Sequence, residues 1–159
     1  MELHTIEPYY NKDSKILILG SFPSVKSREL GFYYAHPQNR FWKVLSNVYN
    51  EEITDLESKK EFLKRNKIAL FDVCASCEIV GSSDSSIKNV QANDIDLILK
   101  NTNIKKIFVN GKTAYNLYNE LIKNKINKEA IYLPSTSAAN ATFSLNDLTK
   151  AYSIIRTID

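Results

Sequence analysis

The sequence predicts a three-layer α/β/α sandwich around a central four-stranded, mostly parallel sheet. Four short apolar runs rich in β-branched residues recur at 15–20, 68–73, 105–110 and 130–134. Their hydrophobicity is continuous and not alternating, which is typical of parallel strands buried on both faces. Helical patterns separate the runs, and strands that alternate with helices predict an α/β fold with right-handed crossovers.

The helical pattern that follows Asn39 is the most regular. Phe41, Val44, Leu45 and Val48 lie three or four positions apart, so they form one apolar face. The other expected helices are one after Thr54 with Thr54 and Glu57 spaced as a capping box, one at 95–99 capped by Asn93 or Asp94, one at 114–122, and one at 145–155 capped by Ser144.

The chain of 159 residues has the length of one domain, and no repeat or linker divides residues 1–159. It holds no apolar run of about 18 residues, so no membrane span is expected. Its first residues are polar and do not resemble a signal peptide. With two cysteines it lacks a disulfide framework, and the cytoplasm is the expected location. The net charge of +3 permits an anionic partner without requiring one.

The expected site lies at the carboxyl edge of the sheet, where open α/β folds bind their ligands. Small, polar, turn-forming segments follow each predicted strand there, at 20–24, 74–86, 110–114 and 134–141. We expect these loops to build the site together with the "YYAHPQN" segment at 33–39.

Each segment also has an ordinary structural interpretation. "GSFPS" (20–24) has the residues of a strand-to-helix turn, and no "GKS" or "GKT" ends it, so it is not a Walker loop. "CASC" (74–77) has metal-like spacing, but its sequence context lacks the histidine and proline of a zinc deaminase motif. Two buried thiols are the expected interpretation. Asp84 either caps a short turn or lines the site.

The "YYAHPQNRFW" segment has two interpretations. In the first, Asn39 is a helix N-cap, Phe41 belongs to the core, and Tyr33 and Tyr34 are half-buried. In the second, the aromatic rings hold a flat ligand and Asn39 directs a polar group toward it.

With "GSFPS", "YYAHPQNRFW" and "LPSTSAANA" in this order, the chain resembles the uracil-DNA glycosylase superfamily. It is most similar to the branch of hypoxanthine-DNA (deoxyinosine) glycosylases, with mismatch-specific uracil glycosylases as neighbours. The resemblance extends over residues 15–155 and implies the same α/β/α fold. It also implies an enzyme that removes deaminated bases (hypoxanthine, uracil or both) from DNA in base-excision repair, with no metal and no organic cofactor.

The resemblance assigns the catalytic role to Asn39, which would position a water molecule without acting as a base. Many superfamily members carry Asn or Asp where this chain has Phe22, so Phe22 departs from the pattern. A phenyl ring can neither hold nor activate water, and it could only form one wall of the base-binding site. The implied base-binding residues are Gly20, Ser21, Phe22, Pro23, Ser24 and Tyr34, with Tyr34 stacking on the base. The implied DNA-binding residues are His36, Ser135, Thr136, Ser137, Ala138 and Asn140.

The remaining expectations concern chemistry and partners. Without a lysine placed for Schiff-base attack, we expect a monofunctional hydrolase, and a monomer that acts on DNA. Arg40 is expected to pair with a carboxylate. Two other functions remain open: a glycosylase-like module that binds DNA lesions without cleaving them, and a hydrolase of free nucleosides.

Overall fold

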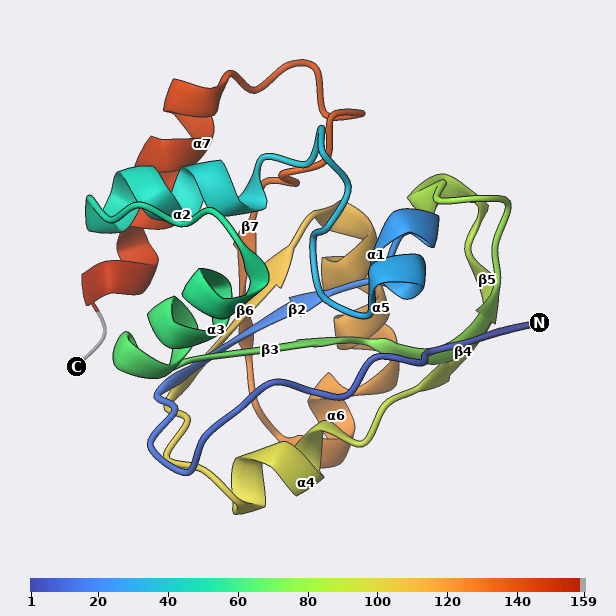
Figure 1. Ribbon diagram of the computed structural model, residues 1–159. Helices are drawn as coiled ribbons and strands as arrows, with labels where there is room; N and C mark the ends of the chain where they lie inside the picture. Colours follow the sequence, from blue (N-terminus) through green and yellow to red (C-terminus); the bar gives the residue numbers. More distant parts are fainter. Residues whose placement is uncertain (158–159) are drawn as a thin grey trace.

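The computed structural model describes residues 1–157 and contains the predicted sheet (Figure 1). Its strands are β2 (Ile16–Gly20), β3 (Ile68–Asp72), β6 (Lys106–Asn110) and β7 (Ala130–Leu133). They are all parallel and lie in the order β3-β2-β6-β7. Every residue of β2 and β3 is buried, which explains why these runs are apolar throughout. The predicted strands and their parallel pairing are confirmed.

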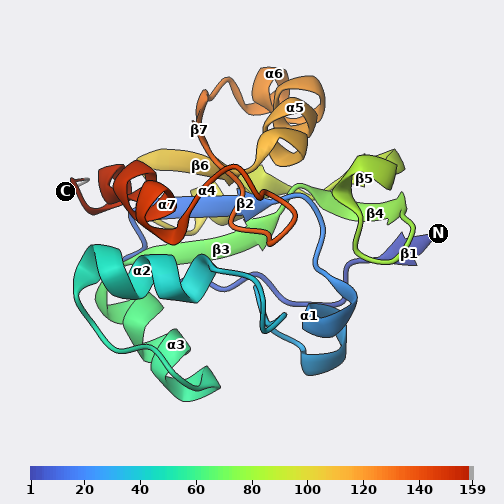
Figure 2. The same cartoon turned by 90° about the horizontal axis from the view of Figure 1, so that it is seen from above.

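Helices cover the sheet on both sides. The α-helices are α1 (Val25–Leu30), α2 (Phe41–Tyr49), α3 (Leu56–Arg65), α4 (Ile95–Lys100), α5 (Lys112–Leu121), α6 (Lys123–Ile126) and α7 (Leu145–Tyr152), and the 3₁₀ turns are η1 (Asp84–Ser86) and η2 (Ser153–Thr157). Figure 2 shows α2 and α3 on one side of the sheet and α5 and α6 on the other. This arrangement confirms the three-layer sandwich.

Helix α2 buries the face that the spacing predicts. Phe41, Val44, Leu45 and Val48 are all buried, and α2 packs against α7. The indole of Trp42 is also buried, and its N–H donates to the carbonyl of Tyr33 at 3.1 Å. This bond joins α2 to the segment that precedes it, and it therefore fixes the chain between residues 33 and 41.

A second, antiparallel sheet was not predicted. The segment after β3, expected as a loop, continues as β4 (Cys74–Glu78), which pairs with β1 (Glu2–Leu3) and β5 (Lys88–Ala92). The expectation failed because this strand is short and half-buried, and its small polar residues match a turn pattern. The pairing brings the N-terminus to the carboxyl end of β3, where the His4 N–H donates to the Ala75 carbonyl at 2.8 Å.

Two helix caps are confirmed and one is wrong. Asp94 and Ser144 accept from the first-turn N–H groups of α4 and α7. The expected cap at Thr54 lies one residue too early, because Asp55 and Ser58 form the reciprocal capping box of α3. Among residues 1–157, no helix combines the length and apolarity that a membrane crossing requires.

Candidate active site

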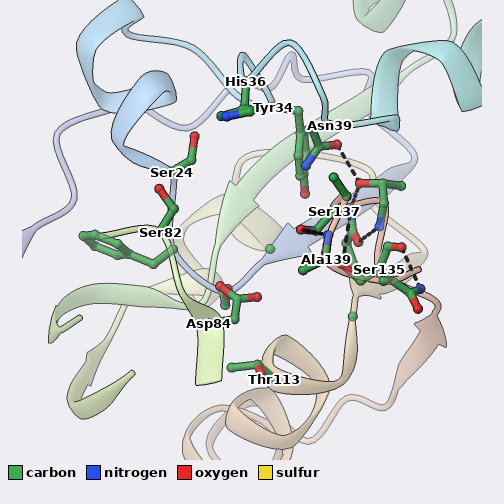
Figure 3. Close-up of a pocket in the computed structure, with 18 of the residues that line it drawn as sticks. Ser24, Tyr34, His36, Asn39, Ser82, Asp84, Thr113, Ser135, Ser137 and Ala139 are labelled. Carbon is green, nitrogen blue, oxygen red and sulfur yellow. Dashed lines mark hydrogen bonds between the residues drawn. The ribbon is translucent and has the colours of Figure 1, made fainter. Parts of the chain in front are cut away.

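A cavity of about 780 Å³ opens at the carboxyl edge of the parallel sheet (Figure 3). Loops that follow β2, β6 and β7 contribute to it, as do the segment before α2 and the turn around η1. The cavity is lined by every site residue that the sequence predicts: Gly20, Ser21, Phe22, Pro23, Ser24, Tyr34, His36, Asn39, Ser135, Thr136, Ser137, Ala138 and Asn140. Residues more than 100 positions apart therefore form one pocket.

Backbone hydrogen bonds from the residues that follow β3 hold the loop at 20–24. The carbonyls of Gly20 and Ser21 accept from the N–H groups of Val73 and Cys74 at 2.8 and 3.0 Å. The N–H groups of Ser21 and Phe22 donate to no group among residues 1–157. Such unpaired donors at a cavity edge are available to a carbonyl oxygen of a ligand. The hydroxyl of Ser24, in contrast, caps α1.

Phe22 belongs to a small apolar cluster. Its ring is only 6% exposed and packs with Cys74 and Cys77, and the Arg28 guanidinium lies 5.1 Å from the ring centroid. The ring touches the cavity from this cluster, so it is a fixed boundary and does not form a free stacking surface.

The two cysteines are free and buried, as expected. Burial raises the pKa of both thiols, so the thiolate that a metal or a nucleophilic reaction needs is disfavoured. Within residues 1–157, no group of three or more histidine, cysteine or carboxylate side chains could hold a metal ion.

Tyr34 is held in an unusual backbone conformation at the cavity wall. Its φ is 53°, in the left-handed region that non-glycine residues seldom adopt. One face of its ring stacks on Phe41, with centroids 3.9 Å apart and an interplanar angle of 16°. Its hydroxyl is buried and makes no hydrogen bond of full geometry within residues 1–157, although the Asn110 side chain lies near it. Burial, followed by the nearby Asp72 carboxylate, raises the pKa of Tyr34, and the Asn110 side chain opposes this rise, so Tyr34 remains a neutral phenol.

Asn39 is oriented by a chain of hydrogen bonds. Its Oδ1 accepts from the Phe41 N–H at 2.9 Å and from the Thr136 hydroxyl at 2.8 Å. An amide oxygen has two lone pairs, so both are used and the Nδ2 donor remains. Figure 3 shows the Asn39 side chain at the cavity, with a dashed line on its oxygen. The capping interpretation is therefore partly right, although the residue at the N-cap position is Arg40.

Thr136 belongs to the same chain of bonds. Its Oγ1 accepts from Asn110 Nδ2 at 3.0 Å, and its N–H donates to Asn110 Oδ1 at 3.1 Å. Thr136 was expected to contact DNA, but it is 0% exposed, so its hydroxyl cannot reach a phosphate. We therefore reassign Thr136 from DNA contact to the positioning of Asn39.

The substitution Thr136→Val tests this positioning role. It removes the hydroxyl at constant volume, leaving Asn39 with one anchor and Asn110 Nδ2 without its acceptor. We expect the base release that the family resemblance implies to fall about tenfold, and stability to fall by about 1–2 kcal/mol. Thr136→Ser keeps the hydroxyl and serves as the control in single-turnover assays and thermal melts. A valine variant with wild-type release would contradict the role.

The loop at 135–140 presents hydroxyls and a small exposed tip. Ser135 Oγ accepts from the Ser137 N–H at 3.1 Å, and Ser137 Oγ accepts from the Ala139 N–H at 3.2 Å. Each hydroxyl proton therefore remains available to a phosphate oxygen, which can only accept. Ala138 is exposed at the tip, whereas Asn140 uses its side chain within the loop.

His36 is exposed and also lines the cavity. Its Nδ1 accepts from the Gln38 N–H at 3.1 Å, so the ring proton of a neutral His36 sits on Nε2. His36 can therefore donate outward, which suits contact with DNA phosphate.

Contrary to expectation, Arg40 pairs with no carboxylate within residues 1–157. Its guanidinium donates to the carbonyls of Phe143, Ser137 and Asn140 at 2.5, 3.0 and 3.0 Å. These carbonyls lie in a loop without regular structure, and the planar fork of arginine satisfies three of them together. Arg40 thus ties the 137–143 loop to the start of α2.

Two residues that line the cavity, Asp72 and Asn110, were given no role by the sequence, whereas Asp84 lines the cavity as one of its two interpretations expected. Asp72 and Asn110 end β3 and β6, and a polar residue at the carboxyl end of a buried strand was the signal that could have found them. Asp84 accepts from the Ser21 hydroxyl at 2.8 Å. Burial raises the pKa of the Asp84 carboxyl; the Ser21 bond opposes this rise and Asp72 adds to it.

The fold and cavity define the class of protein: an α/β/α domain with an open cavity at the carboxyl edge of its parallel sheet. Residues 7–156 match the family model of the uracil DNA glycosylase superfamily. The chain is 35% identical over 144 residues to a hypoxanthine DNA glycosylase of Methanosarcina barkeri strain Fusaro, with 88% of this chain and 89% of that protein covered. It is also 35% identical over 139 residues to a hypoxanthine DNA glycosylase of Methanosarcina acetivorans, covering 86% and 87%.

A solved structure agrees with these relatives. A solution NMR structure from Methanosarcina acetivorans, described as a candidate uracil DNA glycosylase, superposes with a TM-score of 0.81 at 31% identity, covering 95% of this chain and 94% of that chain. The chain therefore belongs to the uracil DNA glycosylase superfamily and is a DNA glycosylase.

Proposed function

We propose that this glycosylase binds DNA, takes a deaminated base out of the duplex and hydrolyses its N-glycosidic bond. Hypoxanthine is the favoured base, because two relatives at 35% identity are named hypoxanthine DNA glycosylase. The observation that carries the proposal is the orientation of Asn39, whose Oδ1 is engaged by two hydrogen bonds so that its Nδ2 is left for the cavity. An enzyme that acts on a base must bring it out of the stack, and the cavity offers a place for it.

The Tyr34 ring and the loop at 20–24 would hold the base. Tyr34 has one ring face against Phe41 and would stack the base on the other, an interaction worth about 1–3 kcal/mol. The unpaired N–H groups of Ser21 and Phe22 would donate to a carbonyl of the base. These donors would also stabilise negative charge on the departing ring, which lowers the barrier for its release.

Asn39 would hold the attacking water. Its Nδ2 can donate to one lone pair of the water oxygen and leave the other directed at the sugar carbon. An amide has no useful basicity, so this role is positioning, and an oxocarbenium-like sugar needs only a well-placed weak nucleophile. The reaction would yield the free base and an abasic site, with water as the only co-reactant and no lyase step. Phe22 replaces a polar residue of many family members, so Asn39 would act without help from that position.

The first test is base release from duplexes that contain one deoxyinosine or one deoxyuridine. We expect abasic sites to form when the enzyme is incubated with a duplex that contains a lesion. The duplex that releases its base faster identifies the preferred lesion. Release should weaken steeply as salt rises, because phosphate contacts release counterions. Free deoxyinosine should be a poor substrate, and rapid hydrolysis of it would instead indicate a nucleoside hydrolase. Tight binding of both duplexes without release would indicate a lesion-binding module.

A further inference from the structure

The turn that joins β4 to β5 (residues 79–87) carries the most exposed large apolar side chain of residues 1–157. This side chain is Val80, which is 75% exposed. Single aliphatic side chains are common on protein surfaces, so exposure alone indicates no function. The place of Val80 is more informative, because Ser82 and Ser83, which follow it closely, line the cavity. Figure 1 shows the turn beside α1 at the carboxyl edge of the parallel sheet.

Hydrogen bonds fix the backbone around Val80. The Val80 N–H donates to Ser86 Oγ at 2.8 Å, and the Val80 carbonyl accepts from the Ser83 N–H at 3.1 Å. The Ser86 hydroxyl donates to the Ser83 carbonyl at 2.6 Å, which closes the turn. Valine is branched at Cβ and therefore has few side-chain rotamers. A rigid apolar side chain of this kind loses little conformational entropy when it inserts into a partner.

Arg28 joins this turn to the loop at 20–24. Its Nη2 donates to the Gly81 carbonyl at 3.2 Å, and its Nε donates to the Pro23 carbonyl at 3.2 Å. One planar guanidinium thus holds both segments at set positions. The place of Val80 is therefore fixed relative to the loop that would bind the extruded base.

We propose that Val80 is the wedge that enters the duplex and occupies the gap left by the extruded nucleotide. The inference rests on the proposed function, because only a protein that extrudes a nucleotide leaves such a gap. Proteins that unstack DNA insert apolar side chains between the bases. A side chain in the gap keeps the neighbouring bases apart and slows the return of the nucleotide to the stack, so the base stays longer in the cavity.

Two other residues at the cavity fit a wedge less well. Ala138 is exposed at the tip of its loop, but its single methyl group is too small to fill the space of a base. Tyr132 also lines the cavity, but it belongs to β7 and its ring packs edge-on against Tyr115, with centroids 5.6 Å apart. Val80 is larger than alanine and projects from a turn, which suits insertion.

The rest of the turn allows DNA to come close. Ser82 Oγ accepts from the Val25 N–H at 2.9 Å, so its proton is free for a phosphate oxygen. Asp84 is the one carboxylate of the turn, and it accepts from the Ser21 hydroxyl within the protein at 2.8 Å. Figure 3 shows Ser82 and Ser135 on opposite sides of the cavity. The turn can therefore approach the duplex from one side while the hydroxyls of the opposite loop contact phosphates on the other.

The test compares Val80→Ser with wild type on one deoxyinosine strand, both alone and paired in a duplex. Serine removes the apolar side chain but keeps the backbone bonds of position 80, so thermal melts should agree. We expect single-turnover release from the duplex to fall about tenfold, because the wedge acts against pairing and stacking. Release from the single strand, where there is no partner strand to separate, should stay unchanged. Val80→Leu keeps an apolar side chain and should retain release from the duplex.

Leu97→Ser is the matched control. Leu97 is also aliphatic and 56% exposed, but it lies on α4, which precedes the amino end of β6 and does not line the cavity. We expect this variant to release base from both substrates as wild type does. Equal falls on the duplex and the single strand in Val80→Ser would indicate a structural role and overturn the inference, and so would an unchanged rate on the duplex.

A second measurement follows the unstacking itself. A 2-aminopurine beside the lesion becomes fluorescent when its neighbour leaves the stack, and the Asn39→Ala background slows release enough to record the signal. We expect the signal to rise on binding and to be largely lost when Val80→Ser is added, whereas an equal signal would overturn the inference. Absence of release by the wild-type protein from either substrate would refute the proposed function, while a fluorescence signal that depends on Val80 would still support insertion.

Discussion

Replacement of Asn39 by alanine is expected to lower base release about 100-fold or more, which corresponds to about 2.7 kcal/mol in the barrier. The reason is that Asn39 Nδ2 is the donor left free for the water once Phe41 and Thr136 occupy Oδ1. The measurement is the single-turnover rate on a duplex with the favoured lesion, at saturating enzyme so that weaker DNA binding does not enter.

Asn39→Ala also removes an acceptor from the first turn of α2, and the loss of such a bond costs about 1 kcal/mol of stability. Asn39→Asp separates the two effects. The aspartate still accepts from the Phe41 N–H and the Thr136 hydroxyl, but it replaces the Nδ2 donor by an oxygen. We expect the aspartate variant to melt near wild type and to release base at least about tenfold more slowly. Wild-type rates in this variant would show that no donor is needed at position 39.

The sequence predicts the sheet and the cavity well because the signals are local. A continuous apolar strand followed by a small polar loop identifies both the strand and the edge of the sheet on which ligands bind. This signal was enough to predict that Gly20, Asn39 and Ser135 line the same pocket. The family resemblance then assigned chemistry to residues whose individual patterns also fitted an ordinary turn or cap.

The missed features depend on long-range pairing. Asp72 was assigned to a strand, and nothing near it in sequence indicates that His4, 68 positions away, would reach it through β1. Thr136 was assigned to DNA because its neighbours are hydroxyl residues, whereas its burial follows from the position of Asn110 at the end of β6. Likewise the partners of Arg40 are carbonyls of a distant loop, which no charge pattern reveals.

Replacement of Gly20 by alanine is expected to destabilise the protein by about 1–3 kcal/mol and to slow base release about tenfold or more. The backbone at Gly20 does not have a positive φ, so the cost is steric. The new methyl group would lie 2.5 Å from Asp72 Oδ1, and this carboxylate cannot move freely because Oδ2 is bound to His4. Either the pair with His4 is distorted or β2 shifts relative to β3.

A double-mutant cycle with Asp72→Ala identifies the cause. Removal of the carboxylate removes the close contact, so Gly20→Ala should cost little further stability in that background, and the coupling should recover most of the 1–3 kcal/mol. Denaturant unfolding of the four proteins gives the coupling directly. Equal costs of Gly20→Ala in both backgrounds would show that the strain arises elsewhere. A large coupling would establish that glycine at the end of β2 is required because the Asp72 carboxylate lies beside it in the wall of the cavity.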